Sequence, residues 1–335
     1  MIGATQRNLM TRKKPKLQVV ANNPKAVKTA KASAPKQPAR VERPRPAPPT
    51  ISGRWLLIAI PTALVAAALC AWAALCLLFW QGSWQLLYHP SSAVNRTPAA
   101  LGLPFSPIGF DTAASGQPRL TGWWIPAAAD AHENRYTFLY FHGQDGNLGD
   151  TVDHLAELHA AGVNVFAFDY RGYGQSEFDH PSETRWLEDA ASALQYLTAT
   201  RHIDPNTIVV DGSDLGADLA LEFAAAHSEV AGVVLESPVD DPVSRIFTDE
   251  RAHLVPAHLL VHDRYDLNAA AAALRIPSLW FLPFPKPSTN GPAENPEVFQ
   301  KVSARKMFVW LPPGKTTTKN FADELTRWLD DLQLR

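Results

Sequence analysis

Short apolar runs alternate with longer segments of helical apolar spacing between residues 136 and 334. The runs are typical of buried strands, whereas apolar residues three and four positions apart indicate helices. The predicted strands are residues 136–141, 163–168, 207–211, 232–236, 278–282 and 307–311. The predicted helices are residues 150–161, 182–200, 215–227, 266–274 and 321–334. This alternation predicts an α/β fold with a mostly parallel sheet that helices cover on both faces.

A much longer apolar run covers residues 55–80, and no Asp, Glu, Lys or Arg occurs from Trp55 to Tyr88. A helix of about 26 residues is about 39 Å long, which exceeds the roughly 30 Å hydrocarbon core of a bilayer. Tryptophans at both ends, Trp55 and Trp80, are typical of membrane interfaces. The run therefore predicts a transmembrane helix. A cleaved signal peptide is the competing interpretation, but the basic region before the run is too long for one.

Charge is divided sharply between the segment before this run and the rest of the chain. Residues 1–54 carry 13 Lys and Arg against one acid, whereas the other 281 residues carry 18 basic and 32 acidic side chains. The basic segment is rich in Lys, Ala and Pro and is predicted to be disordered. The positive-inside rule predicts a signal anchor in a bacterial inner membrane, with the N-terminus cytoplasmic and residues 89–335 periplasmic or extracellular.

The most specific chemical pattern is the pentapeptide Gly-Ser-Asp-Leu-Gly at residues 212–216, between a predicted strand and a predicted helix. Gly212 and Gly216 have the spacing of a nucleophile elbow, in which the central residue occupies a strained turn. Ser213 does not fit the central position, because neither residue two positions away from it is glycine. The pattern therefore places Asp214 at the tip.

Two further loops follow the first two predicted strands of the alternating region. Residues 142–147 read HGQDGN, and residues 169–176 read DYRGYGQS. Beside a nucleophile elbow, two backbone N–H groups form an oxyanion hole, one from the residue after the elbow tip and one from the earlier loop. The residues at these two positions are Leu215 and Gln144.

With these loops the chain resembles the α/β-hydrolase superfamily. The resemblance is to its membrane-anchored serine hydrolases with HGxxGN and DYRGYGxS loops, which include depalmitoylase-like and aminopeptidase-like esterases. It covers roughly residues 86–335 and implies the α/β-hydrolase fold. We therefore expect a disordered tail (1–54), a transmembrane helix (55–80), a membrane-proximal connector (81–117) and a hydrolase domain (118–335) with a short cap near 240–265.

The resemblance also implies a triad of serine, acid and histidine, and this chain differs at all three positions. Asp214 stands in the place of the serine, and no acid occurs in residues 283–292, where the acid is expected. Lys315 stands in the place of the histidine, and the final 73 residues contain no histidine. An ester formed on Asp214 would lack the histidine that activates water for its hydrolysis. We predict an ion pair between Asp214 and Lys315 and the loss of serine-hydrolase chemistry.

The predicted function is therefore that of a membrane-anchored, hydrolase-like protein in binding, scaffolding or regulation. The alternative is an active hydrolase of esters, thioesters, haloalkanes or epoxides that uses Asp214 or a triad rearranged around the cap histidines His253, His258 and His262. Those histidines leave a metal site as a further alternative, but no cofactor or metal is expected. The expected partners are the lipid bilayer, an acyl or apolar small ligand in a relic pocket, and a protein. Nucleic acid is not expected.

Overall fold

The computed structural model describes residues 52–284, 296–312 and 321–333. These residues contain an eight-stranded sheet in the order β10-β9-β8-β7-β4-β6-β3-β2. Strands β10 to β6 pair in parallel, and β3 joins β6 and β2 in antiparallel pairs. The strands are β2 Ser106–Thr112, β3 Pro118–Ile125, β4 Thr137–Phe141, β6 Asn164–Asp169, β7 Ile208–Ser213, β8 Gly232–Glu236, β9 Ser278–Pro283 and β10 Lys306–Leu311. The predicted, mostly parallel sheet is confirmed.

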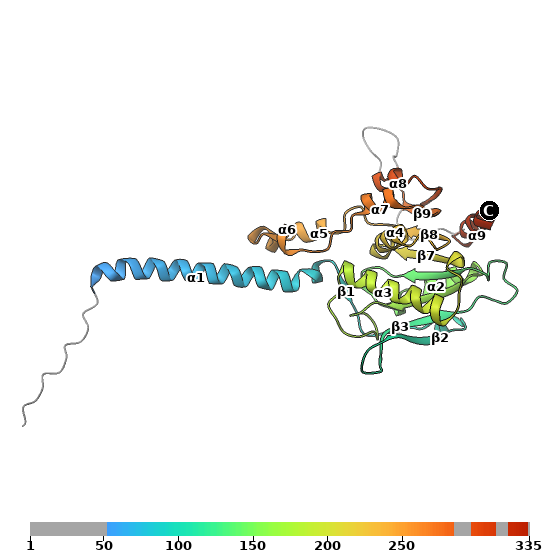
Figure 1. The fold of residues 1–335 in the computed structure, drawn as a ribbon, viewed down its shortest axis with the longest axis horizontal. Helices are drawn as coiled ribbons and strands as arrows, with labels where there is room; N and C mark the ends of the chain where they lie inside the picture. Colours follow the sequence, from blue (N-terminus) through green and yellow to red (C-terminus); the bar gives the residue numbers. More distant parts are fainter. Residues whose placement is uncertain (1–51, 285–295, 313–320, 334–335) are drawn as a thin grey trace, which may run out of the picture. The chain divides into compact units, whose positions relative to one another are not determined.

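Helices cover both faces of the sheet (Figure 1). They are α2 Val152–Ala160, α3 Glu183–Gln195, α4 Leu215–Ala226, α7 Leu267–Ala273, α8 Glu297–Lys301 and α9 Phe321–Gln333. Two short helices, α5 (Ser244–Phe247) and α6 (Ala257–Leu260), lie in the segment predicted as a cap. The predicted helix 182–200 is α3 followed by a π-helical turn, Tyr196–Thr200.

The pleat of the central strands divides the apolar core into two layers. In β4, Phe138 and Tyr140 face a layer that includes side chains of α2 and α9. Leu139 and Phe141 face the other layer, which includes side chains of α3, α4 and α7. All four side chains are buried. A strand covered on both faces has no polar face, and this is why its sequence reads as a continuous apolar run.

The antiparallel edge of the sheet begins within the segment that the sequence assigns to the connector. Strand β2 pairs with β3 from Ser106↔Trp124 to Thr112↔Pro118. Pro107 lies inside β2, and proline in a sheet is confined largely to edge strands, where its missing N–H is tolerated. The proline weakens the strand signal in the sequence. The folded sheet therefore starts before residue 118.

Helix α1 (Gly53–Gly82) is the one helix of the described residues that is long and apolar enough to cross a membrane. Its apolar side chains are largely exposed, among them Leu57 and Ile58. A run of exposed apolar side chains without charge is stable next to lipid and costly in water. Length and composition thus fit the predicted anchor, and its membrane orientation stays a prediction.

Candidate functional site at the elbow

Asp214 occupies the sharp turn between β7 and α4. Its backbone has φ +51° and ψ −124°, a conformation that residues other than glycine rarely adopt. A Cβ atom at Gly212 would collide with the backbone of Gly216, and one at Gly216 would collide with the backbone of Phe141. Both glycines are needed for close backbone approach, and the structure places Asp214 at the tip of a strand-turn-helix elbow.

The Asp214 side chain is exposed at the surface of the elbow, and its backbone N–H donates to the Glu236 carbonyl at 2.9 Å. Partial burial of the carboxyl group raises its pKa, and the negative charge of Asp145 raises it further. Arg245 in α5 acts in the opposite direction. Burial and the Asp145 charge therefore both act against the ionised form of the Asp214 carboxyl group.

One of the two predicted oxyanion-hole donors already has a partner inside the protein. The Leu215 N–H donates to the side-chain Oε1 of Gln144 at 3.3 Å. The Gln144 side-chain amide in turn donates to Asp145 at 3.3 Å. The loop itself is held by the Gln144 carbonyl, which accepts from Tyr173 and from the His89 backbone. A substrate oxyanion would have to displace the Gln144 side chain to reach the Leu215 donor.

A cavity of about 280 Å³ lies beside the elbow. Its lining runs from the buried Tyr140 and Glu236 to the exposed Asp153 and Asp214, so the cavity opens to solvent. His154, on helix α2, also faces it. His154 was not predicted as a site residue, because no sequence motif surrounds it. Its position on the predicted helix 150–161, directly after the loop with Gln144, was the one signal available.

Below this cavity, the His154 side chain meets two buried carboxylates. Its Nε2 lies 3.0 Å from Glu236 Oε1 and 3.6 Å from Asp211 Oδ2. Burial raises the pKa of Glu236 to about 7, although His154 opposes the shift. Burial lowers the pKa of His154, but the nearby Glu236 carboxylate and other groups outweigh it and hold that pKa well above its usual value. His154 is thus directed at these acids rather than at Asp214.

The loops at residues 142–147 and 169–176 are held by buried polar contacts. Asp169 accepts from the Leu148 N–H at 2.9 Å and lies 3.6 Å from His142 Nε2. Burial raises the pKa of Asp169 to about 7 and lowers that of His142 to about 4. Arg171 does not pair with Asp169 but forms a buried ion pair with Asp189, at 2.6 Å. These residues position the loops without facing a reacting atom.

The cap histidines lie elsewhere. His258 stacks on Phe247 with ring centroids 4.0 Å apart, and the neighbouring Asp263 accepts from Tyr88 at 2.8 Å. Within the described part of the chain, none of the histidine ion pairs involves the Asp214 carboxyl. Lys315 and most of residues 283–292 lie outside the described residues. The predicted ion pair between Asp214 and Lys315 therefore stays a prediction.

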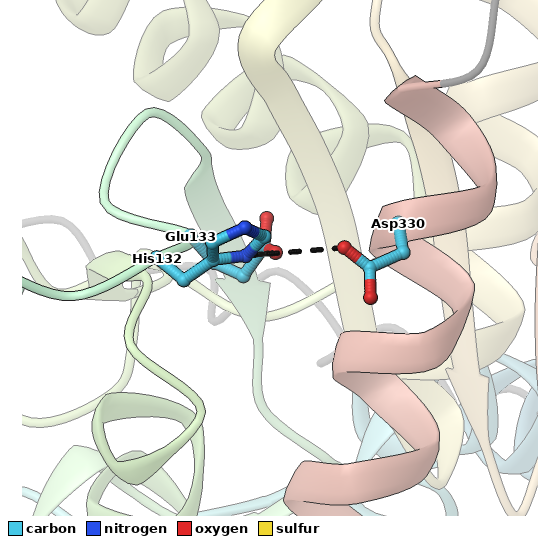
Figure 2. Close-up of side chains that lie close together, drawn as sticks. All are labelled: His132, Glu133 and Asp330. Atoms are coloured by element: carbon cyan, nitrogen blue, oxygen red, sulfur yellow. Dashed lines mark hydrogen bonds and ion pairs between the residues drawn. The ribbon is translucent and has the colours of Figure 1, made fainter.

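A second group of histidine and acids lies on the surface and joins helix α9 to the loop after β3. His132 Nδ1 lies 2.5 Å from Glu133 Oε1 and 3.8 Å from Asp330 Oδ1, as Figure 2 shows. The His132 side chain is 72% exposed and that of Asp330 54%. Glu133 is buried, but ion pairs in which a partner is as exposed as His132 or Asp330 contribute little stability. We assign the group no role beyond this surface contact.

Known proteins resemble the chain over the region that contains the elbow. A family model described as serine aminopeptidase, S33, matches residues 132–278. An uncharacterized protein YfhR of Salmonella typhi is 36% identical over 198 residues, which cover 56% of this chain and 65% of that protein. An uncharacterized protein Rv2307c of Mycobacterium tuberculosis is 31% identical over 164 residues, or 48% of this chain and 56% of that protein. The chain thus spans less than two thirds of these relatives.

The fold is shared with a solved esterase, Pf2001 of Pyrococcus furiosus. The TM-score is 0.54 at 17% identity, and the match covers 74% of this chain and 98% of the esterase. Identity this low shows the fold alone. The chain has an α/β-hydrolase fold, and the family model and the relatives support the α/β-hydrolase superfamily.

Proposed function

We propose that this chain is an α/β-hydrolase-like protein that has lost serine-hydrolase activity and acts by binding. The observation that carries the proposal is the state of the elbow. A carboxylate occupies the tip, and the Leu215 N–H that would stabilise an oxyanion is bound by the Gln144 side chain. Ester hydrolysis builds negative charge on the substrate oxygen, and a neighbouring carboxylate repels that charge.

The charge of the cavity supports the same proposal. Five acidic side chains line it, against the single imidazole of His154: Asp150, Asp153, Glu157, Asp214 and Glu236. Within the lining, an acidic surface favours a cation over an anionic or purely apolar ligand. The acyl or apolar ligand that the resemblance implies stays a prediction.

Lys315 completes the proposed inactive site. The resemblance puts it at the histidine position, and a lysine next to Asp214 is held in its charged form by the carboxylate. An ion pair between the two would neutralise the elbow carboxylate and disable both groups.

We also propose that α1 anchors the chain, with the basic N-terminus cytoplasmic and the folded domain periplasmic or extracellular. The support is the apolar helix and the charge of the preceding segment.

One observation supports the alternative of an active hydrolase that uses Asp214. Among the described residues, His154 is the histidine that lines the same cavity, and from there it could activate a water molecule. Its Nε2 contacts Glu236, however, so it would have to reorient to act on an ester at Asp214.

Hydrolysis assays separate the two proposals. The full chain in detergent micelles is tested with short acyl esters, an acyl thioester, a haloalkane and an epoxide, next to Asp214→Ala and His154→Ala. We expect no turnover above that of Asp214→Ala with any substrate. Turnover by the unaltered chain that disappears in Asp214→Ala would overturn the proposal. If His154→Ala also removed that activity, the alternative would be supported directly.

A further inference from the structure

Three side chains that can bind a metal converge beneath the elbow from three different elements. His154 comes from α2, Asp211 from β7 and Glu236 from the end of β8. In the β7-β8 register Asp211 pairs with Val234 and Ser213 pairs with Glu236. Side chains two positions apart lie on one face of a sheet. Asp211 and Glu236 therefore share the face that α2 covers, and His154 projects from α2 toward both.

The spacing of the three ligand atoms fits a single ion. Nε2 of His154 lies 3.0 Å from Glu236 and 3.6 Å from Asp211, and the three atoms lie within 4.8 Å of one another. Zinc binds imidazole nitrogen and carboxylate oxygen at roughly 2.0–2.2 Å, so neighbouring ligands of a tetrahedral ion are about 3.3–3.6 Å apart. Small side-chain movements would bring all three atoms to that separation.

The same atoms are buried and lack hydrogen-bond partners within the described residues. This holds for His154 Nε2, for both carboxylate oxygens of Asp211 and for Glu236 Oε1. The Asp211 side chain is 0% exposed and that of Glu236 5%. His154 Nε2 and Glu236 Oε1 lie within ion-pair distance. Buried carboxylates without hydrogen bonds are strongly unfavourable unless positive charge compensates them. The imidazole of His154 can supply at most one positive charge for the two carboxylates, whereas a divalent ion balances both.

The surroundings of His154 also match those of a metal ligand. Its other nitrogen, Nδ1, lies 3.8 Å from the Glu157 carboxylate one turn further along α2. Metal-bound histidines commonly direct their second N–H to a carboxylate, which fixes the tautomer and the ring orientation. The imidazole packs between the rings of Tyr140 and Phe321, with centroids 5.0 and 5.5 Å away. The ring is therefore held in place with Nε2 facing the two acids.

We propose that His154, Asp211 and Glu236 bind one divalent transition-metal ion, with Zn²⁺ as the best match. A neutral imidazole and two carboxylates supply two negative charges, which a divalent ion balances. The mixed nitrogen and oxygen set suits Zn²⁺ or Mn²⁺ better than Mg²⁺ or Ca²⁺, which prefer oxygen ligands alone. Three protein ligands leave a fourth position open, and two of them, His154 and Glu236, line the cavity that Ser213 and Asp214 also line. A water molecule or a carboxylate ligand would complete the coordination there.

This site does not depend on whether the elbow hydrolyses a substrate. The metal ligands exclude Asp214, Gln144 and Leu215, and binding of the ion is measured without any turnover. The result of the hydrolysis assays therefore does not decide whether the metal binds. Likewise, a failure to bind metal would not contradict the proposed loss of hydrolase activity.

The experiment uses the untagged full chain in detergent, stripped of metal with a chelator and then dialysed against Zn²⁺. We expect one tightly bound Zn²⁺ per chain by elemental analysis and calorimetry, and a rise in the melting temperature on binding. Asp211→Asn and His154→Ala should weaken the binding by more than about 100-fold. Glu157→Gln, which alters only the carboxylate beside Nδ1, should weaken it by about 10- to 100-fold. His132→Ala, in the exposed group of Figure 2, is the matched control and should leave binding unchanged.

Two measurements distinguish a loss of metal binding from a loss of folding. Asp211→Asn nearly preserves the shape of the side chain, and a cooperative thermal transition of the metal-free variant shows that it is folded. Substituted Co²⁺ should give the visible absorption of a tetrahedral site, and Asp211→Asn should abolish it. If no metal binds, or if Zn²⁺ binds equally well to the Asp211→Asn and His154→Ala variants, the proposal is wrong.

Discussion

At the scale of single residues, Asp214 has the strained backbone conformation of an elbow tip. A non-glycine residue at φ +51° is under strain that costs about 1–3 kcal/mol, and such strain persists where the surrounding structure enforces it. Here the close packing at Gly212 and Gly216 enforces it. The elbow shape is therefore a property of the backbone packing and is independent of the side chain at its tip.

Asp169 gives a pH prediction at the same scale. Burial raises its pKa to about 7, with Asp150 adding to the shift, and His142 Nε2 and the Leu148 N–H face the carboxyl group. The folded chain then holds a proton on Asp169 that the unfolded chain releases near pH 4. Stability from this group is present at low pH and is lost as the pH rises through about 7.

Asp169→Asn should abolish this loss, because the amide keeps an acceptor for Leu148 and does not ionise. Between pH 5 and pH 8, we expect the unaltered chain to lose roughly 1–4 kcal/mol more unfolding free energy than the variant. Denaturant unfolding at the two pH values measures it. Glu236 and Asp189 also have raised pKa values, of about 7 and about 6, and they contribute equally to both proteins. A variant that matched the unaltered chain at both pH values would contradict the prediction.

The position of Asp214 at the elbow tip could be predicted from the sequence, but the side-chain contacts around the elbow could not. The glycine spacing places Asp214 at the tip because the constraint is local in the chain. The contact between Gln144 and Leu215 depends on a side-chain rotamer across two loops. The position of His154 against Asp211 depends on how α2 lies on the sheet. Contacts of this second kind follow from tertiary packing, which no local pattern reports.

At the scale of elements, the junction of β7 and α4 tolerates no side chain at its first glycine. A Cβ atom at Gly212 would collide with the backbone of Gly216, which cannot move without shifting α4. Gly212→Ala should therefore lower the stability by about 1–3 kcal/mol or more. Thermal unfolding of the full chain in detergent measures it. Gly82→Ala is the matched control, since nothing lies within 4 Å of a Cβ atom there. Equal loss of stability in both variants would contradict this account.

Element prediction succeeded where a strand or helix is buried in a regular way. The central strands β4, β6, β7, β8 and β9 agree with the sequence to within a few residues, because burial on both faces leaves a continuous apolar run. Edge strand β2 was missed. Its solvent-facing positions, together with Pro107, leave no such run. The short helix α8 was missed as well, since five residues are too few to show a helical period.

At the scale of the whole molecule, the charge asymmetry of the chain predicts its orientation in a membrane. Residues 1–54 have an excess of basic side chains, and the rest of the chain has an excess of acidic ones. Anionic lipid attracts the first part and repels the second. We therefore expect the basic segment to stay on the cytoplasmic side and to set the orientation of the following helix.

The charge asymmetry predicts the topology of the full chain in a bacterial inner membrane. Alkaline phosphatase, which folds only outside the cytoplasm, should be active when fused after residue 335, and a fluorescent protein that folds only inside should be dark there. Replacing the basic residues nearest the helix, Arg40, Arg43, Arg45 and Arg54, with glutamine should raise the fraction of inverted chains, because the charge that retains the N-terminus is weakened. Alkaline extraction should leave the chain in the membrane fraction. A bright fluorescent fusion, or release of the chain by alkali, would show that α1 does not anchor the domain outside the cytoplasm.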